Sequence, residues 1–296
     1  MEKKKIVITG ASGMFGTHLC RALSRSHNVI GILHRHSGYA LPGVQVETAD
    51  IAKSDEIRKI IQDLAPDIVI HTASYTDVDG CELNPEKAFT VNSEGTKNVT
   101  LACRECEAKL VYISTDYVFD GEKSSPYTEV DSPNPINVYG KSKCSGEAYV
   151  TALLSKWYIV RTAGLFGRGG KNFVDTILKL AQERDELRVV ADQVGCPTFC
   201  ENLADVLRRL ILTGDYGIYH MTNNGYCSWY EFASEILKIM NHDSVRLTPI
   251  TSEELNRPAN RPRYSVLAKT RMEEVLGIKM PHWKVGLRCY LTSNKE

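Results

Sequence analysis

Near its N-terminus the chain reads Lys5-Ile6-Val7-Ile8-Thr9-Gly10-Ala11-Ser12-Gly13-Met14-Phe15-Gly16. A short apolar run therefore ends at three glycines and leads into a helix expected over residues 13–24. Gly10 allows a tight turn, Gly13 lets a pyrophosphate approach the backbone, and Gly16 lets helix and strand pack closely. This spacing predicts a binding site for a dinucleotide.

The start of that helix supplies a second reason for the same prediction. The amides of Met14 and Phe15 would point at a phosphate, and the positive end of the helix favours an anion there. An ordinary strand-to-helix turn is the alternative, because a lone glycine triplet is weak evidence.

The rest of the first half alternates between strands and helices. Apolar strands are expected at residues 28–33, 44–48, 67–71, 109–114 and 157–161, and helices at residues 54–64, 85–106 and 139–153. Continuous apolar strands separated by helices indicate a parallel sheet covered on both faces. The right-handed crossover rule then makes it a doubly wound sheet.

The second half is less regular. Helices are expected at residues 172–184, 201–212 and 228–240, and short strands at residues 187–190, 217–220 and 246–249. The sequence therefore predicts an α/β fold: a Rossmann-like, doubly wound parallel sheet with a smaller α/β substrate-binding lobe. We expect the NAD(P)-binding domain to comprise residues 1–163 and 201–222, and the lobe to comprise residues 164–200 and 223–296.

Composition restricts the classes of partner. The chain has 296 residues with 36 Lys+Arg and 36 Asp+Glu, so nothing suggests bulk attraction to nucleic acid or to anionic membrane. No apolar stretch is long enough to span a bilayer, and the basic N-terminus lacks the features of a signal peptide. Nine cysteines without regular spacing, including the pair Cys103 and Cys106, fit reduced thiols. We expect a cytoplasmic protein.

The ends of three strands suggest how a cofactor would lie. The second strand ends at Leu33-His34-Arg35-His36, where a basic cluster replaces the acid typical of NAD sites. Arg35 there suits the 2′-phosphate of NADP, so NADPH is favoured and NADH is the alternative cofactor. Alternatively, Arg35 is a solvated loop residue without a role in binding. Asp50 and Ile51 could flank the adenine, and the small residues of 71–76 would let the cofactor pass.

The chemistry is suggested by Tyr139 and Lys143, four residues apart on one helix and therefore on one face. A phenol ionises near pH ~10, and a neighbouring ammonium is expected to lower the pKa of Tyr139. Tyr139 would protonate a carbonyl oxygen, Thr115 would hold that oxygen, and a cofactor would supply hydride. No metal is needed. Alone, the tyrosine–lysine spacing is a common surface pattern.

Five longer motifs carry a resemblance: residues 114–121, 137–143, 172–174, 192–198 and 261–267. They resemble the extended short-chain dehydrogenase/reductase superfamily and, within it, the dTDP-4-dehydrorhamnose reductase family. The resemblance implies NADPH-dependent reduction of the C4 keto group of a nucleotide-linked 6-deoxyhexose, and it is compatible with a homodimer.

The resemblance also assigns residues to roles. It implies that Thr115, Tyr139 and Lys143 are catalytic and that Thr115 and Asp116 touch the sugar. Besides the glycines, the residues implied to line the cofactor are Met14, Phe15, Asp50, Ile51, Ser74, Tyr75, Thr76, Tyr139 and Lys143.

One position departs from the family pattern. Gly164 stands where the family usually has a tryptophan that packs against the deoxysugar. Glycine removes that platform from the substrate site, so another nucleotide-linked keto sugar is an alternative substrate. The other alternative is that Tyr117 or Phe166 packs against the sugar in place of the missing tryptophan.

Two competing functions stay open at this point. Sugar-nucleotide epimerases and dehydratases resemble the chain in fold and in catalytic trio. Dehydratases usually add an acid pair, but Tyr117 stands where their glutamate is expected. A regulatory subunit of methionine adenosyltransferase resembles the chain as well, and it binds NADP while serving a partner enzyme.

Overall fold

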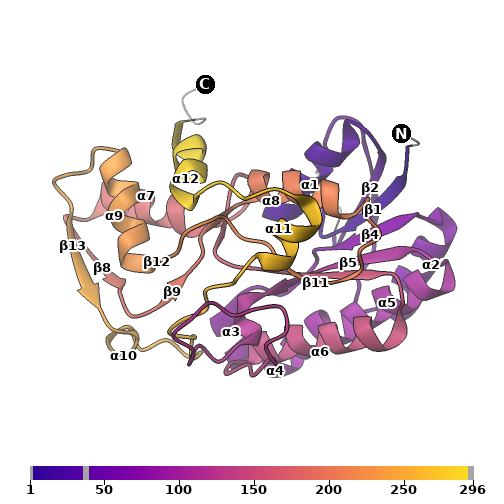
Figure 1. Cartoon of the computed structure of the whole chain (residues 1–296), viewed down its shortest axis with the longest axis horizontal. Coiled ribbons are helices and arrows are strands. Elements are labelled where there is room, and N and C mark those ends of the chain that lie inside the picture. Colours follow the sequence, from indigo (N-terminus) through magenta and orange to yellow (C-terminus); the bar gives the residue numbers. More distant parts are fainter. Residues whose placement is uncertain (1–2, 36–39, 293–296) are drawn as a thin grey trace.

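A computed structural model describes residues 3–35 and 40–292, so His36 lies outside the described residues. Figure 1 shows a large sheet flanked by helices and, beside it, a smaller lobe that carries the elements α7, α9, β8 and β13.

The large sheet has seven strands in the order β11-β6-β5-β4-β1-β2-β3, and all neighbours are parallel. The strands are β1 Lys5–Thr9, β2 Asn28–Leu33, β3 Val44–Thr48, β4 Ile68–His71, β5 Lys109–Thr115, β6 Trp157–Thr162 and β11 Gly217–His220. The order reverses between β1 and β4, where chain connections leave in opposite directions. Ligands of such sheets bind at this switch point, beyond the carboxyl ends of the strands.

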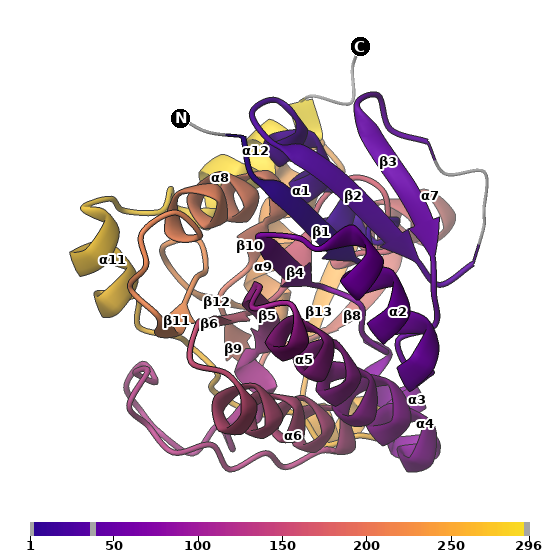
Figure 2. The same cartoon turned by 90° about the vertical axis from the view of Figure 1, so that its right-hand side faces the viewer.

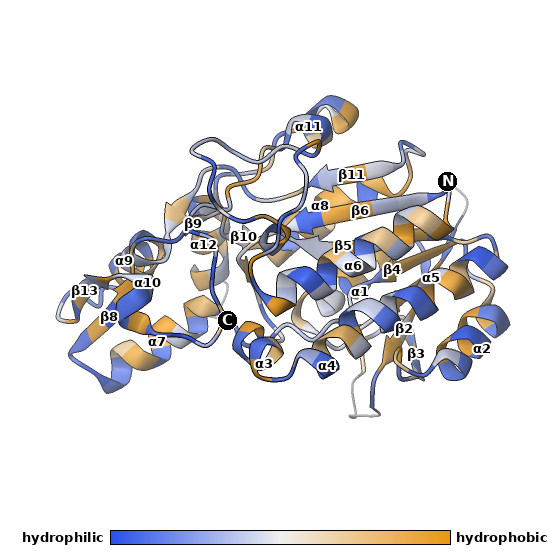
Figure 3. Ribbon diagram, turned by 90° about the horizontal axis from the view of Figure 1, so that it is seen from below, coloured by the Kyte–Doolittle hydropathy of each residue, from blue (hydrophilic) through white to orange (hydrophobic). Residues whose placement is uncertain are grey.

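Alternating apolar residues hold helices on both faces of the sheet. Ile6 and Ile8 of β1 pack toward α1 Met14–Ser24 and α8 Cys200–Leu210, whereas Val7 packs toward α2 Ser54–Leu64 and α5 Gly95–Glu105. Helix α6 Val138–Leu153 lies beside α5 (Figure 2). Figure 3 shows the central strands as mainly hydrophobic and the helices as amphipathic, with one hydrophobic and one hydrophilic side. The predicted doubly wound fold is confirmed.

The segment between β4 and β5 is more broken than the single helix expected over residues 85–106. It contains α3 Val78–Leu83, α4 Pro85–Phe89 and a π-helical turn, Thr90–Glu94, before α5. Wide turns of this kind are rare and are frequent at functional sites. A 3₁₀ turn, Asp116–Val118, follows β5 directly.

Within the described residues, the smaller lobe comprises three two-stranded sheets and four helices, and its apolar core is separate from those of the large sheet. The strand pairs are β7 Leu165–Phe166 with β10 Thr198–Phe199, β8 Glu186–Val190 with β13 Arg246–Ile250, and β9 Val194–Gly195 with β12 Cys227–Ser228. The helices are α7 Phe173–Glu183, α9 Trp229–Ile239, α10 Ser252–Leu255 and α12 Trp283–Thr292.

One segment lies differently from the expected domain division. The sequence predicts that helix α11 Thr270–Leu276 belongs to the lobe with residues 223–296. Met272 of this helix, and Met280 after it, are instead buried in the core of the large sheet. The reason is that α11 packs against the edge strand β11, and its apolar side is covered there. The other proposed boundaries stay a prediction.

The described residues include no helix with the length and apolar character needed to cross a bilayer.

Candidate active site

A cleft of about 730 Å³ joins the carboxyl ends of the strands to the lobe. Its walls include the glycine turn, the end of β5, the first turn of α6 and the lobe residues around β9. One cavity therefore brings together the three motifs that the sequence singled out separately.

The glycine turn has the geometry that a bound pyrophosphate needs. Gly10 has a φ of +67°, and a Cβ there would lie 2.7 Å from the amide nitrogen of Ala73. A Cβ on Gly16 would lie 2.2 Å from the carbonyl oxygen of Gly10, so only glycine lets α1 start this close to β1. Helix α1 begins after Gly13 without a side-chain cap and without an acid in its first turn. Its amides therefore face the cleft, where an anion would be stabilised.

Two buried hydroxyl groups give an independent sign that the cleft is built for a polar ligand. Ser114 Oγ and Thr162 Oγ1 both line the cleft, and neither has a hydrogen-bond partner among the described residues. Buried polar atoms without partners are uncommon in folded proteins. Together with the uncapped N-terminus of α1, these two hydroxyl groups fit a dinucleotide and a polar substrate.

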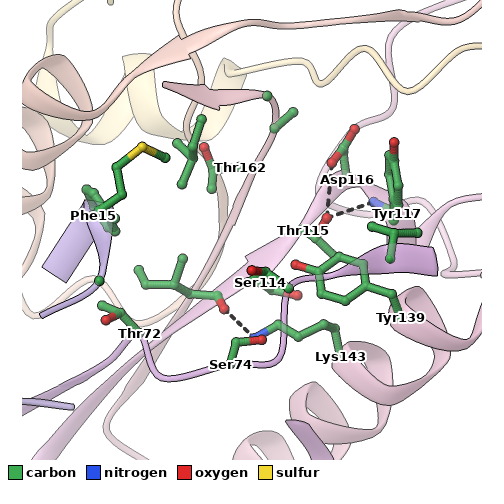
Figure 4. A pocket seen from close by; sticks show the side chains of 18 of the residues that line it. Phe15, Thr72, Ser74, Ser114, Thr115, Asp116, Tyr117, Tyr139, Lys143 and Thr162 are labelled. Atoms are coloured by element: carbon green, nitrogen blue, oxygen red, sulfur yellow. Dashed lines mark hydrogen bonds between the residues drawn. The ribbon is translucent and has the colours of Figure 1, made fainter. Parts of the chain in front are cut away.

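Close approach of α6 to the end of β5 brings the predicted trio together. A Cβ on Gly140 would lie 2.0 Å from the carbonyl oxygen of Tyr117, so the helix reaches this turn only because residue 140 is glycine. Asn137 caps the helix by accepting a hydrogen bond from the amide of Gly140 at 2.8 Å. Figure 4 shows the hydroxyl of Tyr139 beside Ser114 and Thr115, with Lys143 below it.

Lys143 is buried in the floor of the cleft. Its Nζ donates a hydrogen bond of 2.7 Å to the carbonyl oxygen of Ile113 and lies 4.1 Å from the centre of the Tyr112 ring. Burial lowers the pKa of Lys143 to about 7, and the charge of Glu147 opposes that shift. The ammonium is thus fixed in place one helical turn from Tyr139.

The expectation that Lys143 lowers the pKa of Tyr139 is wrong for this arrangement. Burial raises the pKa of Tyr139, the charge of Asp116 adds to the rise, and a side-chain hydrogen bond with Thr115 opposes it. The ammonium of Lys143 is directed to the Ile113 carbonyl instead of the phenol. A raised pKa keeps the phenol protonated, which is the form that can donate a proton.

Thr115 and Asp116 are joined to Ser265, a residue of the motif at 261–267 to which the sequence assigned no role of its own. Thr115 Oγ1 donates to Asp116 Oδ1 at 3.0 Å and accepts from the amide of Tyr117 at 3.1 Å. The other carboxylate oxygen, Oδ2, accepts from the hydroxyl of Ser265 at 2.5 Å. Burial raises the pKa of Asp116 to about 6, although these hydrogen bonds oppose the shift.

Most residues expected at the cofactor do line the cleft: Gly10, Gly13, Met14, Phe15, Gly16, Asp50, Ile51, Ser74, Thr76, Tyr139 and Lys143. The side chain of Tyr75 turns elsewhere, because its ring packs under Lys87 with Nζ 4.3 Å from the ring centre. Arg35 is exposed just after β2 and is not part of the cleft lining, whereas its neighbour His34 is.

Gly164 lies in the wall of the cleft, between the sheet and the lobe. Its φ is +53°, and a Cβ there would lie 3.2 Å from the carbonyl oxygen of Cys196. The left-handed backbone therefore favours glycine at this position. Tyr117 also lines the cleft, whereas Phe166 is fully buried in the core of the lobe and cannot replace a platform there.

Sequence reasoning missed Asn92, which lies in the π-helical turn. Its amide accepts from Ser74 Oγ at 2.9 Å and from the Tyr75 amide at 2.7 Å, and it donates to Ser142 Oγ at 3.0 Å. Asn92 therefore connects the loop after β4 to α6. A buried asparagine inside a helix carries no distinctive sequence signal, because its partners come from distant segments.

Sequence reasoning also missed Lys171. A Cβ on Gly170 would lie 2.8 Å from Met14 Cβ, so the loop before α7 packs against the start of α1. Lys171 thereby joins the lining of the cleft near that helix end.

We expect replacement of Asn92 by alanine to lower the free energy of unfolding by about 2–3 kcal/mol, because several buried polar groups lose their partner. Chemical denaturation measures this. Asn28→Ala, at the exposed start of β2, is the control and is expected to change stability by less than about 0.5 kcal/mol. Equal effects of the two substitutions would contradict the connecting role of Asn92.

Comparison with known proteins gives consistent matches over nearly the whole chain. Residues 4–295 match the family model described as the RmlD substrate binding domain. The spore coat polysaccharide biosynthesis protein SpsK of Bacillus subtilis is 39% identical over 287 residues, which cover 97% of this chain and 96% of that protein. The dTDP-4-dehydrorhamnose reductase of Burkholderia thailandensis is 36% identical, with 96% and 97% covered.

A solved structure agrees in sequence and in shape. The crystal structure of dTDP-4-dehydrorhamnose reductase from Bacillus anthracis, in complex with NADP, matches with a TM-score of 0.91 and 38% identity, covering 99% of this chain and 100% of that one. By its motifs, its cleft and these relatives, the chain belongs to the dTDP-4-dehydrorhamnose reductase family of the extended short-chain dehydrogenases/reductases.

Proposed function

We propose that this protein is an NADPH-dependent reductase that converts dTDP-4-dehydrorhamnose to dTDP-L-rhamnose. The observation that carries the proposal is the single cleft that joins the glycine turn to Thr115, Tyr139 and Lys143. The names of its relatives support the same activity.

The bound cofactor would supply a hydride to the carbonyl carbon of the substrate. The glycine turn and the start of α1 would hold its pyrophosphate, and Asp50, Ile51, Ser74 and Thr76 would line its path toward β5. Tyr75, which the resemblance also implied, is not part of that lining, because its ring packs under Lys87. Lys143, in the floor of the cleft, would hold the nicotinamide end of the cofactor.

The remaining chemistry belongs to side chains of this protein. Tyr139 donates its phenolic proton to the carbonyl oxygen of the sugar as that oxygen gains charge. Its raised pKa keeps the phenol protonated, so the proton stays available. Thr115 holds the same oxygen in line, while Asp116 and the wall at Gly164 contact the sugar.

The decisive experiment is to measure NADPH oxidation with a panel of 4-keto sugar nucleotides. We expect turnover with dTDP-4-dehydrorhamnose and exchange of the cofactor between turnovers. Retention of the cofactor without net oxidation would instead indicate an epimerase. Tight NADP binding with no oxidation, together with a co-purifying synthetase, would indicate a regulatory subunit like that of methionine adenosyltransferase.

One observation favours a second candidate substrate. Gly164 leaves the wall of the cleft without the large side chain usual in the family, and its backbone conformation resists a bulky replacement. Another nucleotide-linked 6-deoxy-4-keto sugar would then be reduced by the same residues. A kcat/KM at least about tenfold higher for a different sugar in the panel would establish that substrate.

Arg35 gives a test of the preference for NADPH over NADH. We expect Arg35→Ala to weaken NADPH binding by about tenfold and NADH binding much less, because a charged hydrogen bond to the 2′-phosphate is worth about 1.5 kcal/mol. Fluorescence titration measures both affinities. Arg184→Ala, an exposed arginine after α7, is the control. Equal losses for the two cofactors would remove Arg35 from the phosphate site, leaving His34 as the candidate.

The same proposal extends to the location, the partners and the assembly of the enzyme. A cytoplasmic location supplies NADPH and sugar nucleotides, and the balanced charge of the chain fits a protein without nucleic-acid partners. A homodimer is the assembly we expect, and light scattering at working concentration would measure it.

A further inference from the structure

The hydroxyl group of Thr115 has only one hydrogen, and that hydrogen is already engaged. A threonine hydroxyl donates once and accepts through two lone pairs. Thr115 donates to Asp116 Oδ1 and accepts from the amide of Tyr117. Its remaining lone pair lies toward Tyr139, the other side chain that hydrogen-bonds with it, so in this arrangement Thr115 has no hydrogen to offer the cleft. A substrate carbonyl oxygen, however, needs a donor.

Asp116 controls that hydrogen through its own protonation. An ionised carboxylate only accepts hydrogen bonds, whereas a protonated carboxyl also donates one. A proton on Oδ1 would reverse the bond, so that Asp116 donates to Thr115 and the hydrogen of Thr115 becomes free to turn into the cleft. Ser265 fixes the far side of the carboxyl group by donating to Oδ2 at 2.5 Å.

We propose that Asp116, held by Ser265, sets the direction of the Thr115 hydroxyl and thereby decides whether Thr115 can donate a hydrogen bond to the substrate. The inference rests on the proposed reductase function. Ser265 acts in it as a positioning residue, and Asp116, besides its proposed contact with the sugar, orients the hydroxyl of Thr115. The donor form is the active one because reduction places negative charge on the carbonyl oxygen.

The groups around Asp116 allow its protonation state to change near neutral pH. The titratable groups that face Asp116 are Tyr117 in its own turn, Tyr139 from α6 and Cys196 from the loop after β9. Burial raises the pKa of all three, so all are neutral and none fixes the charge of Asp116. With the pKa of Asp116 near 6, the carboxyl group gains its proton as the pH falls through that value.

The sign of the expected pH dependence follows directly. Below the pKa of Asp116, Thr115 is a donor and the single-turnover rate of NADPH oxidation is high. As the pH rises through this pKa, Thr115 becomes an acceptor and the rate falls. Lys143, whose pKa lies near 7, also titrates in the cleft, so a variant must separate the two groups.

Ser265→Ala provides that separation. It removes a hydrogen bond that stabilises the ionised form of Asp116, so the falling limb of the rate profile is expected to move to higher pH by about one unit. The limb due to Lys143 would stay in place. Asp116→Asn is expected to abolish the limb, because the amide can donate to Thr115 at every pH.

The matched control is Thr248→Ala, since Thr248 donates to Glu186 at 2.6 Å in an exposed hydroxyl–carboxylate pair of the lobe. It is expected to leave the profile unchanged. A ¹³C NMR titration of the Asp116 carboxyl group in wild type and in Ser265→Ala measures the same pKa without turnover, and thermal unfolding checks that each variant is folded.

The possible failures are distinct. A normal wild-type turnover with the same falling limb in Ser265→Ala and in Asp116→Asn would overturn this inference and leave the reductase function standing. An unshifted carboxyl titration in folded Ser265→Ala would overturn it as well. Absence of NADPH oxidation with every keto sugar would overturn the proposed function itself.

Discussion

Replacement of Tyr139 by phenylalanine is expected to lower kcat by about 10²–10⁴-fold, the usual contribution of a positioned proton donor. The phenylalanine ring keeps the packing against Tyr117, whose ring centre lies 6.1 Å away, but it has no proton to give. Stopped-flow measurement of NADPH oxidation gives the rate. The affinity for NADPH is expected to change little, because the phenol is only one of many groups along the cleft.

Tyr149 on the same helix provides the matched control for this prediction. Its hydroxyl donates to Glu94 at 3.0 Å in an exposed position, so Tyr149→Phe removes a phenol from α6 without touching the cleft. We expect near wild-type turnover for that variant. A Tyr139→Phe protein with wild-type kcat would show that another group supplies the proton, and the acid role would have to be reassigned.

Replacement of Glu147 by leucine is expected to lower the free energy of unfolding by about 3–5 kcal/mol, because it leaves a buried guanidinium without its partner. Arg161 donates to Glu147 through Nε at 2.9 Å and through Nη2 at 2.7 Å, and the arginine is only 1% exposed. Glu147 lies one helical turn beyond Lys143, so this pair also supports the catalytic face of α6. Urea denaturation monitored by circular dichroism measures the loss.

Two further variants test whether the unpaired charge is the cause. Glu147→Leu combined with Arg161→Met removes both charges and is expected to recover much of the lost stability. Asp205→Ala breaks an exposed pair with Arg208 and is expected to change stability by less than about 1 kcal/mol. If the double variant is as unstable as Glu147→Leu alone, the stability is lost through poorer packing and not through the unpaired charge of Arg161.

The sequence by itself determined the architecture, because the signals for it are local. The continuous apolar run of Ile6, Val7 and Ile8, all buried, and the glycines that follow specify a covered parallel strand and a tight turn within a dozen residues. The spacing of Tyr139 and Lys143 likewise fixes a shared helical face. Such features depend on backbone geometry within one or two elements, and these expectations could be made without knowing what lies beside them.

The tertiary structure decided the properties that depend on neighbours distant in the chain. Ser265 meets Asp116 across 149 residues, and Asn92 meets Ser142 across 50, so neither contact leaves a pattern in the sequence. The same holds for the pKa of Tyr139, which follows from burial and from the direction of the Lys143 ammonium, and not from the four-residue spacing. Hydrogen-bond direction and desolvation are set by what surrounds a group in space, and only the folded chain specifies those surroundings.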